Sequence, residues 1–194
     1  MVHKIPVSYV LLALVGALAL GPVAAAAPVN YEVDTVHSSL IFRIKHLDVG
    51  FTYGRFNDFS GKMVVDEASP AGSSVEITAQ IASVDTNNAK RDQHLRSPDF
   101  FNANQFPTMT YKSTAVSKSG DEYSVQGNLT LHGVTKAVTI KMKKTGEGKD
   151  PRGNELIGFE GTMTIKRSDF GMDKMSQAVG DWVWITVAVE AIKK

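Results

Sequence analysis

The 194-residue chain contains no cysteine, which excludes disulfides, thiol nucleophiles and cysteine-ligated metals. An N-terminal cysteine that carries a lipid is excluded for the same reason. The chain also lacks a G-x-S-x-G segment and any two histidines at H-x-H or H-x-x-x-H spacing. The sequence therefore predicts no catalytic residue and no metal site, and we expect no cofactor.

A large charge of one sign is also missing. Lys4 is the only charged residue before Glu32, so residues 27–194 carry 20 acidic side chains and 20 of the 21 basic ones. A net charge near zero argues against nucleic acid or an anionic membrane surface as an electrostatic partner.

The beginning of the chain differs from the rest in composition. An apolar run from Val7 to Leu20 is followed by a Gly-Pro break and a run of small residues in which Ala24 and Ala26 form an A-x-A pattern. This order is typical of a secretory signal peptide, and we expect cleavage after Ala26. The alternative is an uncleaved membrane anchor, but the Gly-Pro break falls inside the roughly 20 apolar residues that a spanning helix needs.

Residues 27–194 should then form one mature domain, because they contain no internal repeat, linker or low-complexity stretch. We expect no stable membrane insertion of this mature chain. Apolar and polar residues alternate there in eight short segments, most clearly over residues 75–81. This period of two is typical of antiparallel strands with one solvent-exposed face, and short polar turns separate the segments. Eight such strands are enough to close a barrel, so the expected fold class is all-β.

The inward faces of these strands are expected to line an apolar channel. Gly127 and Gly161 alternate with apolar residues on that face, which indicates either a strand bend or clearance for a ligand. Four methionines on the same face favour a cavity. The predicted channel residues are Phe42, Ile44, Met63, Ile77, Ile81, Met109, Tyr111, Leu129, Ile140, Phe159, Met163 and Ile185.

A short helix over residues 87–96 is predicted at the barrel rim, capped by Asp85 or Thr86 and ended by Ser97-Pro98. We expect Asp92 to be an exposed or salt-bridging residue of this helix, because charged helix residues commonly face solvent. The predicted rim and gate residues are Arg91 and His94, which could meet a ligand head group, and the aromatic cover Phe100, Phe101 and Phe106.

Near the end of the chain, Arg167 is expected to pair with Asp169 and hold the turn that follows the seventh predicted strand. Trp182 and Trp184 alternate with inward-facing valines and should face outward or toward the rim helix.

Several sequence blocks resemble the YceI-like family of polyisoprenoid-binding proteins. They include DTVHSSLIFRIKHL, YGRFNDFSGKMVVD, SVDTNNAKRDQHLRSPDFFNANQFPTMTYKST, GNLTLHGVTKAVTI and IKRSDFGM, which span roughly residues 31–192. The resemblance implies a lipocalin-like antiparallel barrel in the bacterial periplasm, with an elongated channel for a long isoprenoid or other lipid tail. It assigns no catalytic role to any position.

The leading hypothesis is therefore a periplasmic lipid-binding protein, not an enzyme, that carries an isoprenoid chain or similar lipid through water. A second hypothesis is an enzyme that acts on a lipid head group at the rim, with His94, Arg91 or Arg167 polarising it. A third is an interaction protein that uses an exposed strand edge, which a closed barrel would leave little room for. The sequence leaves open whether the protein forms a homodimer.

Overall fold

The computed structural model describes Met1 and residues 27–194, so the predicted signal peptide lies almost wholly outside the described residues. Most of the described chain is strand. The strands are β1 (Val29–Val33), β2 (Ser39–His46), β3 (Gly50–Phe56), β4 (Phe59–Val65), β5 (Ser74–Gln80), β6 (Val84–Asp85), β7 (Thr108–Ser119), β8 (Glu122–Leu131), β9 (Val134–Lys149), β10 (Glu155–Lys166) and β11 (Val179–Lys193). One α-helix, α1 (Ala89–Arg96), and three short 3₁₀ turns, η1 (Pro70–Gly72), η2 (Ile81–Ser83) and η3 (Arg167–Phe170), complete the described part.

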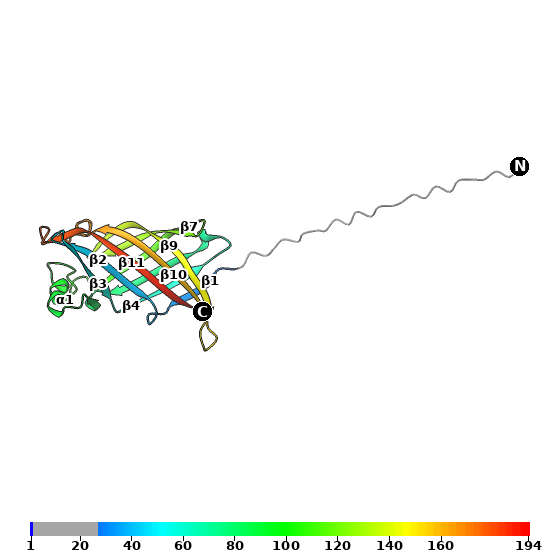
Figure 1. Cartoon of the computed structure of the whole chain (residues 1–194), viewed down its shortest axis with the longest axis horizontal. Coiled ribbons are helices and arrows are strands. Elements are labelled where there is room, and N and C mark those ends of the chain that lie inside the picture. Colours follow the sequence, from blue (N-terminus) through cyan, green and yellow to red (C-terminus); the bar gives the residue numbers. More distant parts are fainter. Residues whose placement is uncertain (2–26) are drawn as a thin grey trace.

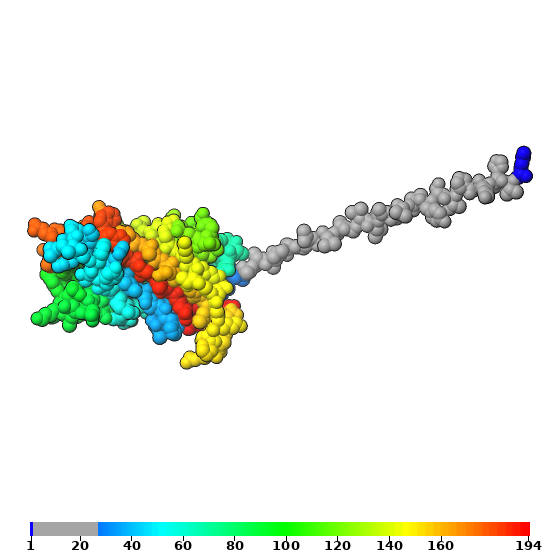
Figure 2. All heavy atoms as spheres, viewed as in Figure 1, coloured from blue at the N-terminus to red at the C-terminus, as the bar shows by residue number. Residues whose placement is uncertain are grey.

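The strands close into a barrel, which confirms the predicted fold class. The hydrogen-bonded ring of eight runs β1-β4-β5-β7-β8-β9-β10-β11 and returns to β1, with every pair antiparallel. β11 is long enough to pair with β1 at one end and with β2 at the other. Figure 2 shows this strand in red between β2 and β10.

The predicted set of eight segments does not coincide with the ring of eight. The sequence did not indicate β1, β3 or β6, whereas β2, which it did indicate, extends the sheet beyond the ring together with β3 and β6. β1 is only five residues long, and although its sequence VNYEV alternates between apolar and polar residues, so short a segment was not among the eight predicted. Its place in the ring depends on pairing with residues 191–193 at the other end of the chain.

The helix lies at the end of the barrel that is far from the C-terminus (Figure 1). It begins at Ala89 rather than at the predicted Asn87, which has a positive φ of 60°. The predicted caps were wrong, because the side chain of Asn88 accepts the bond from the Arg91 amide, at 3.0 Å. Ser97 has an extended conformation before Pro98 and ends the helix as predicted. No helix in the described residues is long and apolar enough to cross a membrane.

Candidate functional site

An apolar cavity lies at the barrel end that carries α1. Its volume is about 90 Å³, and its exposed wall is formed by apolar atoms. Strands β2 and β11 supply one side, and the segment after α1 closes over the other. Of the predicted channel residues, four line this cavity: Phe42, Ile44, Met109 and Ile185.

A second, smaller cavity of about 50 Å³ lies toward the other end of the barrel. The predicted channel residues Met63 and Phe159 line it, together with Val125 and Tyr123. The two cavities are lined by different residues. The remaining predicted channel residues line neither cavity; they belong to the packed interior and are Ile77, Ile81, Tyr111, Leu129, Ile140 and Met163.

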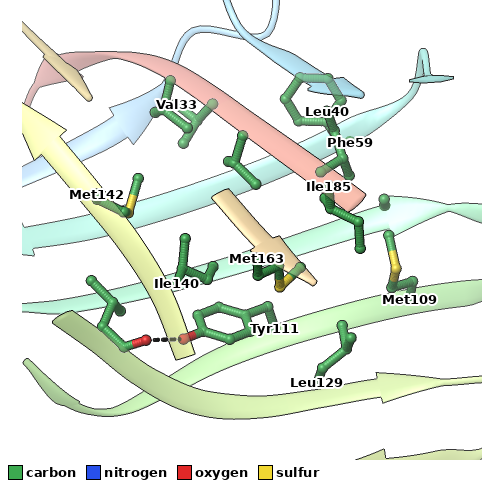
Figure 3. Packing of buried hydrophobic residues seen from close by; sticks show 14 of the residues in the cluster. Val33, Leu40, Phe59, Met109, Tyr111, Leu129, Ile140, Met142, Met163 and Ile185 are labelled. Carbon is green, nitrogen blue, oxygen red and sulfur yellow. Dashed lines mark hydrogen bonds between the residues drawn. The ribbon is translucent and has the colours of Figure 1, made fainter. Parts of the chain in front are cut away.

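A layer of tightly packed side chains occupies the middle of the barrel, as Figure 3 shows around Tyr111 and Ile140. Tyr111 is 5% exposed and its hydroxyl donates a hydrogen bond to the Val125 carbonyl oxygen at 2.9 Å. Burial raises the pKa of Tyr111 to about 12, because the phenolate would lose its hydration. Leu129, on the paired strand β8, is 1% exposed.

The two interior glycines make room for this packing. A Cβ at Gly127 would lie 2.6 Å from the ring and hydroxyl of Tyr111, and one at Gly161 would lie 2.5 Å from Cγ of Met142. Both distances are too short for a real contact. Close approach by the protein's own side chains therefore explains these glycines, and in this structure neither is needed to clear space for a ligand.

Two of the three predicted gate aromatics cover the first cavity. Phe100 is 8% exposed and lines the cavity beside Phe101, whose ring meets the ring of Phe56 edge-on with centroids 5.7 Å apart. Phe106 does not line it. Its ring packs against His132, with centroids 4.8 Å apart.

The two predicted head-group residues lie off the cavity wall. His94 places Nε2 at 3.0 Å from an Asp99 carboxylate oxygen, and both side chains are about half exposed. Arg91 donates from Nε to the Thr86 hydroxyl and from Nη2 to the Thr86 carbonyl oxygen, each at 2.7 Å. These contacts fasten α1 to β6, the strand that ends just before Thr86.

The expectation that Asp92 is exposed was wrong. Its side chain is buried, and one carboxylate oxygen accepts hydrogen bonds from both the amide and the hydroxyl of Thr86. The helix turns this residue toward the barrel, so burial here depends on the tertiary position of α1 rather than on residue type.

The predicted Arg167–Asp169 pair was also wrong. Arg167 is 4% exposed, and its guanidinium donates to the carbonyl oxygens of Gly180, Met172 and Val179 at 2.9, 2.5 and 2.9 Å. Arg167 also lines the apolar cavity, and it is the only one of the three residues considered for head-group contact that does so. The carbonyl groups that accept its hydrogen bonds lie 5 to 13 residues further along the chain, so a prediction based on neighbouring residues could not find them.

The tryptophans face outward as predicted. Trp182 is 48% exposed, and the guanidinium of Arg43 lies over the rings of Phe51 and Trp184 at 4.5 and 5.4 Å from their centroids.

Asp34, His37 and Glu190 bring potential metal-ligand atoms within 4.8 Å of one another beside the turn between β1 and β2. His37 Nδ1 lies 2.8 Å from an Asp34 carboxylate oxygen, and this bond raises the pKa of His37 and lowers the pKa of Asp34. A hydrogen-bonded ion pair accounts for the arrangement of Asp34 and His37.

We expect Asp34→Asn to lower the pKa of His37 toward its ordinary value of 6.5, because the substitution removes the carboxylate that favours the imidazolium. In the unchanged protein, the stabilisation from a raised histidine pKa is present below pH 6.5 and is lost as pH rises through the folded-state value. NMR titration of the imidazole checks this. An unchanged pKa in the variant would contradict the assigned pair.

Comparison with known proteins places this barrel in a family. The family model described as the YceI-like domain matches residues 31–191. The chain belongs to the YceI-like family. A UPF0312 protein of Pseudomonas paraeruginosa is 45% identical to this YceI-like chain over 183 residues, which cover 94% of this chain and 96% of the relative.

Solved structures share the YceI-like barrel. Burkholderia cenocepacia BcnA superposes with a TM-score of 0.75 and 28% identity, covering 81% of this chain and 98% of that one. A polyisoprenoid binding domain from Saccharophagus degradans has a TM-score of 0.66 over 86% of this chain and 99% of that one, and its 16% identity shows a shared fold.

Proposed function

We propose that this protein binds the apolar tail of an isoprenoid, or of a similar long-chain amphiphile, inside its barrel and carries it through the periplasm. The observation that carries the proposal is the apolar cavity beneath Phe100 and Phe101, which adjoins the hydrophobic core of the barrel. The polyisoprenoid binding domain from S. degradans, which shares this fold, supports the ligand class. The signal-peptide pattern in residues 1–26 supports export.

The physical basis of the proposal is burial of hydrocarbon. Each methylene moved from water into an apolar site contributes about 0.8 kcal/mol, so a long chain binds tightly with few directed contacts. The cavity of about 90 Å³ is small for such a chain. A long tail must therefore displace side chains in the barrel, and the flexible thioethers of Met109 and Met163 are suited to that repacking.

Organic extraction of the natively purified protein, followed by mass spectrometry, tests the proposal. We expect a long-chain amphiphile at a stoichiometry near one. Ile185→Phe, which fills the cavity, should reduce the extracted lipid, whereas Thr186→Phe, on the next residue of β11 and on the opposite face, should not. Absence of lipid from the native protein, together with no uptake of added prenols or fatty acids, would refute the proposal.

We expect the double substitution Phe100→Ala and Phe101→Ala to speed ligand release by about tenfold, because two aromatic contacts over the bound chain are lost. Stopped-flow dilution of a loaded fluorescent fatty acid measures this rate. Phe106→Ala is the matched control, since this ring packs on His132 outside the cavity wall. Equal release rates for all three proteins would show that the rings do not gate the cavity.

A further inference from the structure

Arg167 is a buried cation in the wall of an otherwise apolar cavity. It stands at the start of η3, directly after the last residue of β10, and only 4% of its surface is exposed. The other lining residues of this cavity are hydrophobic and its exposed wall consists of apolar atoms, so Arg167 contributes only the apolar part of its side chain to the wall. Its guanidinium, which is the only charged group among the lining residues, is buried behind that surface.

The guanidinium has an incomplete set of partners. A guanidinium carries five N–H donors. Three of them reach the carbonyl oxygens of Gly180, Met172 and Val179, one from each nitrogen. Two N–H groups, one on each terminal nitrogen, have no acceptor among the described residues.

The charge of Arg167 also lacks a direct counter-ion. None of the salt bridges among the described residues includes Arg167. Asp181 and Asp173 are near enough to act on it through space, but the Asp181 carboxylate accepts bonds from the amide and hydroxyl of Ser168. Burial lowers the pKa of Arg167, because removal from water disfavours the cation. Buried charges in proteins are normally paired, so this one has unused capacity for an anion.

We propose that Arg167 binds the head group of the carried amphiphile and that this head group is anionic, a carboxylate or a phosphate monoester. This inference rests on the proposed function and adds the chemistry of the polar end. Oxygen atoms of either group match the two free N–H donors and supply the missing negative charge, once the alkyl part of Arg167 moves aside and opens the guanidinium to the cavity. The tail then extends past Ile185 and Met109 into the barrel.

Competition between matched ligands tests the inference. The full mature protein is offered oleate with oleyl alcohol, and geranylgeranyl phosphate with geranylgeraniol, and native mass spectrometry gives the ratio bound in each pair. We expect each anion to be favoured by about tenfold or more over its alcohol, because charge-assisted hydrogen bonds are the stronger kind. A preference in only one pair identifies whether carboxylate or phosphate is the head group.

Variants assign the preference to the residue. Arg167→Gln should bind both alcohols as the unchanged protein does but favour the anions by less than about twofold, because the charge is gone. Arg91→Gln is the matched control and should keep the full preference, since Arg91 contacts Thr86 outside the cavity wall. A preference that survives in Arg167→Gln would overturn the inference.

A measurement on the unchanged protein covers the case in which Arg167→Gln does not fold. Oleate should shift the arginine Nε–H NMR signal of Arg167, and oleyl alcohol should shift it much less. Equal binding of anions and alcohols would overturn the inference while leaving the proposed function intact. Failure of all four amphiphiles to bind would refute the proposed function itself.

Discussion

Replacing Tyr111 by alanine should lower the free energy of unfolding by about 3–5 kcal/mol, the range for removal of a large buried aromatic side chain. The ring fills the layer between the two cavities and packs so closely on Gly127 that no Cβ fits there. The substitution also removes the hydrogen bond to the Val125 carbonyl oxygen. Urea denaturation followed by circular dichroism measures the change.

Tyr111→Phe separates the ring from its hydroxyl. This variant keeps the packing and should cost only about 1 kcal/mol, the usual net contribution of one hydrogen bond. If Tyr111→Ala lowered the free energy of unfolding no more than Tyr111→Phe, the packing of the Tyr111 ring would contribute little to stability. The cavity left by Tyr111→Ala should also raise the affinity for longer chains relative to shorter ones, which the native mass spectrometry assay measures.

Asp92→Ala should destabilise the protein by about 2–3 kcal/mol, an effect expected for loss of a buried carboxylate that accepts two hydrogen bonds. The amide and the hydroxyl of Thr86 both donate to this carboxylate, and Thr86 is itself 6% exposed. Without Asp92, these donors are left buried, and α1 keeps only the Arg91 contacts to the end of β6. Thermal unfolding and denaturant titration measure the loss.

Asp99→Ala is the control for Asp92, because Asp99 lies near the other end of the same segment and is exposed on the surface. It should change stability by less than about 0.5 kcal/mol. Equal effects of the two substitutions would mean that the buried carboxylate contributes no more than a surface one.

The strands and the closed barrel could be predicted from the sequence because alternation is a local property. Residues 75–81 and 157–165 alternate plainly, and the structure buries nearly every apolar member of these sets at least in part. The strand β1 alternates in the same way, but it is only five residues long and was not predicted. It closes the ring only because residues 191–193 lie beside it in the folded chain.

The candidate site could be predicted only in part. The clustering of Phe100, Phe101 and Phe106 indicated an aromatic cover, and the first two of these rings lie on the cavity wall. The polar residues could not be assigned, because their partners are set by contacts between segments. Asp92 looked like an exposed helix residue, and Arg167 looked like the partner of a neighbouring aspartate.

The sequence by itself determined that the protein is an all-β barrel with an apolar interior, because a period of two places every second side chain on one face whatever the partner strand is. Only the tertiary structure decided which inward residues line a cavity and which form the packed layer. That division depends on the register that sets Tyr111 opposite Leu129, next to Gly127. The burial of Arg167 likewise arises from three carbonyl groups that the fold brings around it.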